Sequence, residues 1–72
     1  MGIKKRFGLA IQKKRISAGI SQEELAMRID ADQAYVSRIE AGQMNVTLET
    51  VEQIASALNV DVSVLFASGR ND

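Results

Sequence analysis

The chain has 72 residues and contains no proline, cysteine or histidine; its nine basic and nine acidic side chains give a formal net charge of zero. A chain of this length forms one domain with a thin core. The absence of cysteine excludes disulfides and thiolate metal sites, and the absence of histidine removes the commonest general base and metal ligand. These limits favour a binding module over an enzyme, and we expect neither a cofactor nor a metal.

The charges are unevenly distributed along the chain. Residues 1–28 carry seven basic and two acidic side chains, a net of +5, whereas residues 29–72 carry two basic and seven acidic side chains, a net of −5. This asymmetry is compatible with one face directed toward phosphate, and equally with ordinary solvated surface charge. No apolar run approaches the roughly 18 residues of a membrane span, and no signal-peptide pattern follows the first residues. We therefore expect a soluble, cytoplasmic protein.

Apolar residues recur at helical spacing throughout, which predicts five helices. The first covers residues 3–17 and ends before Gly19, a residue free to adopt a positive φ. Gly8 lies inside this helix, where glycine costs about 1 kcal/mol relative to alanine, so we expect a close contact there. Its buried face is predicted to comprise Ile3, Phe7, Ala10, Ile11 and the stem of Lys14.

The second and third predicted helices are short and carry clear capping signals. The second covers residues 22–29, with Ser21 as N-cap and Glu24 completing a capping box. The third covers residues 33–41, capped by Asp32 and closed by Gly42.

The fourth predicted helix covers residues 48–58 and is capped by Thr47. Its apolar stripe is Leu48, Val51, Ile54, Ala55 and Leu58. A short last helix begins at Asp61 and contains Val62, Leu65 and Phe66. The prediction is thus an all-α domain over residues 1–67, followed by a frayed tail at residues 68–72.

The segment from residue 22 to residue 41 is the most informative. Two short helices are joined by only about three residues, which forces a sharp crossing and predicts a helix-turn-helix. Ala26 is small at the point where the two helices come closest. The apolar positions of the segment, which are expected to face a shared core, are Leu25, Ile29, Ala31, Val36 and Ile39.

Residues 19–26, 36–42, 47–51 and 54–58 together resemble the phage-repressor-like (Xre-type, Cro/repressor) helix-turn-helix family over nearly the whole chain. The resemblance implies a compact five-helix lambda-repressor-like domain that binds double-stranded DNA. Asp30 stands where the turn of the family usually has glycine, and aspartate tolerates the left-handed conformation better than most residues.

The face of the third helix opposite Val36 and Ile39 is the candidate reading surface. Arginine pairs with guanine, glutamine pairs with adenine, serine is adaptable, and alanine meets the thymine methyl group. The alternative is an ordinary solvated helix face. The predicted base-contacting residues are Gln33, Ala34, Ser37 and Arg38.

Phosphate contacts require donors at the rim of the groove. Gln22 opens the second helix, and the resemblance implies that it holds a phosphate and braces Gln33 as well. For Asn45, turn chemistry is an equal alternative. The cluster Lys4, Lys5 and Arg6 adds sequence-independent attraction or is merely solvated. The predicted phosphate-contacting residues are Gln22, Gln43, Asn45 and Tyr35.

The resemblance also implies an ion pair between Arg15 and Glu40, linking the first helix to the end of the third. Relatives bind as homodimers to two half-sites roughly 34–36 Å apart, and a twofold interface needs a self-complementary apolar patch. We expect Val62, Val64 and Phe66 to supply that patch, whereas Leu65 is assigned to the core.

The favoured function is therefore a repressor or autoregulator of a phage, plasmid, restriction–modification or toxin–antitoxin operon, bound to a roughly palindromic operator. Activation through RNA polymerase is a further option, because Glu23 and Glu24 lie on the second helix. The alternative is a protein-interaction module or antitoxin-like partner that retains the fold with little DNA reading, which the neutral net charge favours slightly.

Overall fold

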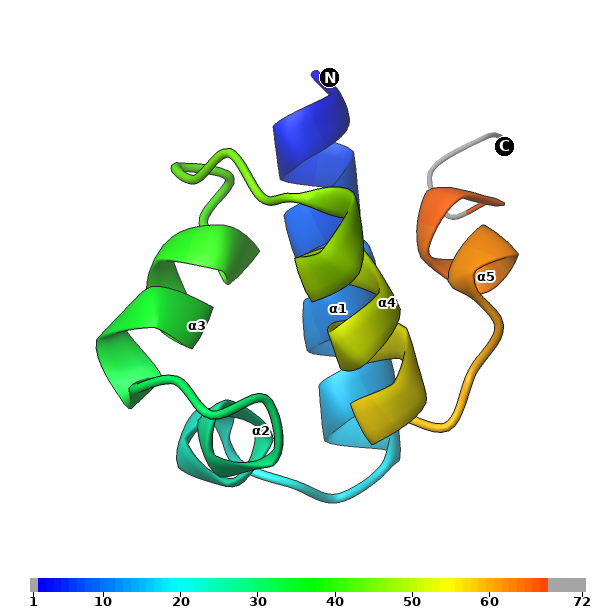
Figure 1. Ribbon diagram of the computed structural model, residues 1–72. Coiled ribbons are helices and arrows are strands. Elements are labelled where there is room, and N and C mark those ends of the chain that lie inside the picture. The colour runs from blue at the N-terminus through cyan, green and yellow to red at the C-terminus, as the bar shows by residue number, and fades with distance from the viewer. Residues whose placement is uncertain (1, 68–72) are drawn as a thin grey trace.

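The computed structural model describes residues 2–67, and the regular structure within them is entirely helical (Figure 1). The all-α prediction is confirmed, with helices α1 (Ile3–Ser17), α2 (Gln22–Arg28), α3 (Gln33–Glu40), α4 (Leu48–Ala57) and α5 (Val62–Ala67). Three helices end one residue before the predicted position, because Ile29, Ala41 and Leu58 are C-caps. The predicted tail at residues 68–72 lies outside the described residues.

Side-chain caps set the starts of three helices. The side-chain oxygens of Ser21, Asp32 and Thr47 each accept a hydrogen bond from the backbone N–H three residues further along the chain, as predicted. The capping box at α2 is only half formed, because the carboxylate of Glu24 accepts a hydrogen bond from Arg28 Nε at 3.0 Å. The side chain therefore stabilises the outer surface of α2 and not its first turn.

Backbone in the left-handed region makes the turns between helices. Gly19 and Gly42 have φ values of 74° and 75°, as their predicted closing roles require. Asp30, in the turn between α2 and α3, has a φ of 59°. The Ala31 N–H donates to the Ala26 carbonyl at 2.8 Å across this turn. Asp30 therefore adopts the left-handed backbone conformation that the sequence predicts aspartate to tolerate.

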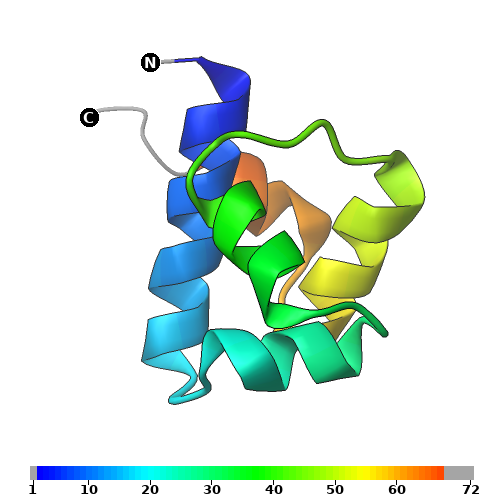
Figure 2. The ribbon, with the colours of Figure 1, turned by 90° about the vertical axis from the view of Figure 1, so that its left-hand side faces the viewer.

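Helix α1 lies against α3 on one side and α5 on the other, while α2 contacts α3 and α4 (Figures 1 and 2). The predicted close contact at Gly8 is confirmed, because a Cβ atom there would clash with the carbonyl oxygens of Ile39 and Glu40. The backbones of α1 and α3 therefore touch. The largest fully buried side chains come from all five helices and are Ile11, Leu25, Val36, Ile54 and Leu65.

Three predicted core positions are wrong. Ile3 and Leu48 are 54% and 84% exposed because each opens its helix, one turn before that helix reaches the core. Lys14 is also exposed. Instead Arg15, the next residue, points toward the interior one helical turn after the buried Ile11, and its side chain is only 11% exposed.

Candidate nucleic-acid interface

Helix α3 presents a polar face to solvent on the side away from the core. Val36 and Ile39 are almost fully buried and fix the inward side of the helix. Figure 2 views the molecule from the side on which α3 lies in front. The four predicted base-contacting residues share the outward side, where Gln33, Ala34 and Arg38 are exposed and Ser37 is half-buried. They form one surface, called here the reading face.

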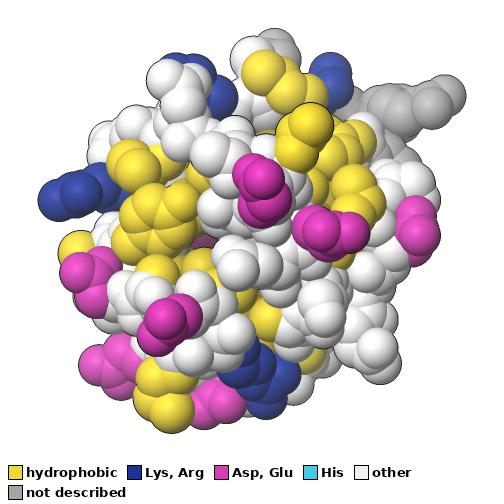
Figure 3. All heavy atoms as spheres, viewed as in Figure 1, with side chains coloured by type: hydrophobic (Ala, Val, Ile, Leu, Met, Phe, Trp, Pro, Cys, Tyr) yellow, Lys and Arg dark blue, Asp and Glu magenta, His cyan; other side chains and the backbone are white. Residues whose placement is uncertain are grey.

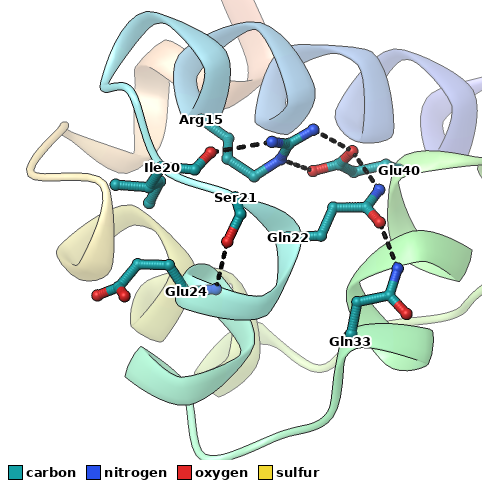
Figure 4. A network of polar contacts seen from close by, with 7 residues as sticks. All are labelled: Arg15, Ile20, Ser21, Gln22, Glu24, Gln33 and Glu40. Atoms are coloured by element: carbon teal, nitrogen blue, oxygen red, sulfur yellow. Dashed lines mark hydrogen bonds and ion pairs between the residues drawn. The ribbon is translucent and has the colours of Figure 1, made fainter.

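An ion pair between α1 and the end of α3 lies behind the reading face (Figure 4). Arg15 Nε donates to Glu40 Oε2 at 2.6 Å, and Arg15 Nη2 donates to Glu40 Oε1 at 3.1 Å. The third guanidinium nitrogen, Nη1, donates to the Ile20 carbonyl oxygen at 3.0 Å. The carboxylate side chain is 3% exposed. A bidentate pair of this kind is both strong and directional, so it fixes the position of α3 on α1.

Two glutamines extend this pair to the reading face. Gln22 Nε2 donates to Glu40 Oε1 at 3.0 Å, and Gln33 Nε2 donates to Gln22 Oε1 at 2.6 Å (Figure 4). The brace expected between Gln22 and Gln33 is therefore present, whereas the bond from Gln22 to Glu40 was not predicted. The sequence offered a basis for predicting a further donor to Glu40, because a buried carboxylate has more acceptor sites than one arginine fills. Arg15, Glu40, Gln22 and Gln33 are called here the polar relay.

The remaining predicted phosphate contacts occupy two environments. Gln43 and Asn45 are exposed in the loop between α3 and α4. Tyr35 is half-buried on α3 and packs against the core. Gln43 and Asn45 are therefore accessible to a phosphate beside the C-terminal end of α3, whereas much of the Tyr35 side chain is buried inside the domain.

Arg28 is a structural residue that the sequence reasoning missed. Its Nη1 donates to the Ala57 carbonyl oxygen at 3.0 Å, which closes the last turn of α4, and its Nε binds Glu24. The spacing of Glu24 and Arg28 predicts their pairing on one helix face, but the carbonyl partner follows only from tertiary packing. Glu23, considered for a contact with RNA polymerase, is exposed on α2.

A second surface, on the α4 and α5 side, is apolar. Val62 is 38% exposed, and Val64 is half-buried. Phe66 is half-buried and stacks on Phe7 with ring centroids 5.2 Å apart. Two adjoining hollows share Leu48 and Phe66; one reaches Ile3 and the other reaches Val62. Ile3, Leu48, Val62 and Phe66 are called here the apolar surface.

Figure 3 shows hydrophobic side chains gathered over the start of α4 and beside α5, with acidic side chains among them. Glu49 and Glu52 line the same hollow as Leu48 and Val62. None of the helices within residues 2–67 combines the length and apolar character needed to cross a bilayer. The same part of the chain holds no cluster of three acidic side chains placed to bind a metal ion.

The five helices, the short α2–α3 turn and the reading face define a helix-turn-helix protein. A family model described as helix-turn-helix matches residues 11–65, and the chain belongs to this family. The predicted resemblance and fold class are therefore confirmed.

The chain is similar to the control protein C.MunI of Mycoplasma sp, with 41% identity over 66 residues that cover 90% of this chain and 89% of the relative. It also superposes on the restriction–modification controller protein C.AhdI of Aeromonas hydrophila, with 37% identity and a TM-score of 0.83 over 86% of this chain and 90% of that one. A third similar structure is the controller protein C.Esp1396I, a tetramer in complex with its natural 35 base-pair operator, with 31% identity, a TM-score of 0.82 and 93% and 88% of the two chains covered.

Proposed function

We propose that the chain is a sequence-specific DNA-binding transcription regulator of the controller kind, which acts in the cytoplasm and is not an enzyme. The observation that carries the proposal is the exposed polar face of α3, held in place by the polar relay from behind. A surface held rigid before binding loses less conformational entropy when it meets a ligand. The similarity to control and controller proteins supports the same function.

Reading takes place in the major groove, which α3 enters from its N-terminal end. Arg38 is exposed and pairs with the acceptors of guanine, whereas Gln33 pairs with adenine. Ser37 and Ala34 lie between them and contact neighbouring base edges. The four side chains therefore cover only a few base pairs, too few for an operator read by one copy.

Phosphate contacts at the two ends of α3 set the register of the helix on the duplex. Gln43 and Asn45 are exposed at one end and are free to donate to backbone oxygens. Gln22 lies at the other end, where its amide already joins Glu40 to Gln33, so its main contribution is to hold the reading face in position. Tyr35 contributes at most its exposed edge.

The regulator acts as a homodimer through the apolar surface. Leu48, at 84%, and Ile3, at 54%, are more exposed than Val62, so the interface extends from α5 onto the starts of α4 and α1. An apolar patch of this kind costs free energy in water, and a twofold axis through it buries the same residues of both copies. Two reading faces then address a roughly palindromic operator.

The test is selection of binding sites from random duplex DNA, followed by the Arg38→Ala variant on the selected site. A roughly palindromic motif is expected, and the variant should lose about 1–3 kcal/mol of discrimination at one base position per half-site. Lys13→Ala is the matched control, because it removes an exposed cation from α1 and should leave base preference unchanged. Selection that yields no motif would contradict DNA reading and favour the protein-interaction alternative.

A further inference from the structure

Lys5 lies directly against the loop that leaves the reading helix. Gly42 has a φ of 75°, and a Cβ atom there would lie 3.0 Å from Lys5 Cα and 3.1 Å from Lys5 Cδ. The backbone and the methylene stem of Lys5 therefore lie directly against Gly42.

The loop at Gly42 is in turn fixed to the last turn of α3. The Gly42 N–H donates to the Ile39 carbonyl, and the Gln43 N–H donates to the Arg38 carbonyl, each at 3.0 Å. Lys5 is consequently held next to the residue that precedes Gln43. Because lysine packs its methylene stem on protein and keeps its ammonium in water, we expect the Lys5 ammonium to lie in solvent beside this end of the reading face.

No other cation comes from the loop itself. Residues 41–48 contain neither a basic nor an acidic side chain, so Gln43 and Asn45 offer only neutral donors. Among its neighbours on α1, Lys4 is also exposed and lines a hollow with Asn45, whereas Arg6 is half-buried, and its Nε is covered without a hydrogen-bond partner. Lys13 and Lys14 are exposed two turns or more further along α1.

We infer that the ammonium of Lys5 binds a phosphate of the DNA backbone beside the loop after α3, and so adds a sequence-independent contact from outside the helix-turn-helix. This inference rests on the proposed function. The contact anchors the duplex at the α3 C-terminal end, opposite the end braced by Gln22.

The salt dependence of operator binding by the full-length chain tests the contact. Each phosphate contact contributes about 0.9 to the slope of log affinity against log salt concentration. Lys5→Gln keeps most of the stem, and we expect it to reduce the slope by about 0.9 for each bound protomer while leaving the base preference and thermal melting unchanged. Lys5→Arg should restore the slope.

Lys13→Gln is the matched control, since it makes the same change of charge on an exposed position of α1. An unchanged slope in Lys5→Gln, or an equal reduction in Lys13→Gln, would overturn the inference and leave the proposed function intact. Failure of the wild-type chain to bind any duplex would overturn both.

Discussion

The reading face and the apolar surface lie on different sides of the molecule and differ in how their side chains are supported. Behind the reading face, Arg15 and Glu40 form a nearly buried bidentate pair, and two glutamines carry its hydrogen bonds to the start of α3. Within residues 2–67 no comparable polar network lies behind the apolar surface, and its Leu48 side chain is 84% exposed. The reading face is therefore held in position by contacts within one chain. The apolar surface leaves hydrophobic area exposed to water, which a second copy of the chain would cover.

Removal of Glu40 should have the largest effect, because it breaks the support of the reading face. Glu40→Ala leaves Arg15 nearly buried without its partner, and the loss of one member of a buried pair costs about 3–5 kcal/mol. That is a large share of the stability of a small domain. Chemical denaturation followed by circular dichroism measures the free energy of unfolding.

Glu24→Ala is the matched control for Glu40→Ala. Glu24 also pairs with an arginine, Arg28 Nε at 3.0 Å, but both side chains are more than 40% exposed. An exposed pair one helical turn apart contributes about 0.3–0.5 kcal/mol. Equal losses in the two variants would mean that the relay does not support the reading face.

A charge placed on the apolar surface should have the next largest effect. Leu48→Glu removes an apolar side chain whose burial is worth about 1.5–3 kcal/mol. Because a twofold dimer carries the change in both copies, we expect the dissociation constant of the dimer to rise by roughly a hundredfold or more. Sedimentation velocity over a range of concentrations measures the change, and thermal melting at a fixed low concentration checks the fold.

Met27→Glu is the control for the apolar surface. Met27 is 73% exposed, but it lies on α2 and outside the hollows that contain Leu48. It should leave the dimer unchanged. A dimer that tolerates Leu48→Glu as well as Met27→Glu would show that the apolar surface is not the interface.

The smallest expected effect concerns the cap of α5, beside the apolar surface. Hydrogen bonds from the Ser63 hydroxyl and then from the Ser63 N–H lower the pKa of Asp61 below its usual 3.8. A lowered pKa means that the cap contributes fully above the unfolded value and loses its contribution as the pH falls through the folded value. The carboxylate is fully exposed, so the change should be confined to α5.

A nuclear magnetic resonance titration of the Ser63 amide measures this effect. The midpoint in the wild type should fall below 3.8, and the transition should be missing from Asp61→Asn. A midpoint at or above that value would contradict the cap. Glu52→Gln, an exposed change on α4, should leave the titration of Ser63 unaltered.

Most of the fold follows from local signals in the sequence. Helical periodicity and the capping residues Ser21, Asp32 and Thr47 placed the helices within one residue of their observed ends, because caps act over three residues of chain. Periodicity alone cannot tell which turn of a helix reaches the core. Ile3 and Leu48 fit the apolar pattern but lie beyond the core, at the ends that other helices do not cover.

The candidate site also has parts that the sequence predicts and parts that depend on tertiary packing. The outward face of α3 could be predicted because Val36 and Ile39 define the inward one. The pair Arg15–Glu40 was available from the family resemblance, although 25 positions separate its members. Contacts between distant segments that no pattern marks, such as Arg28 with the Ala57 carbonyl or Lys5 with Gly42, depend on the packing angles of the helices.

The polar relay also has a direction. Arg15 can only donate and an ionised Glu40 can only accept, so the Gln22 amide must turn its nitrogen toward Glu40 and its oxygen toward Gln33. The Gln33 amide is oriented in turn: one N–H is bound to Gln22, while the second N–H and the carbonyl oxygen are left for another partner. A glutamine that can flip presents either end to a base, whereas this one cannot flip without placing two oxygens together. The donor and acceptor pattern offered at the first position of α3 is thus set by an arginine on a different helix.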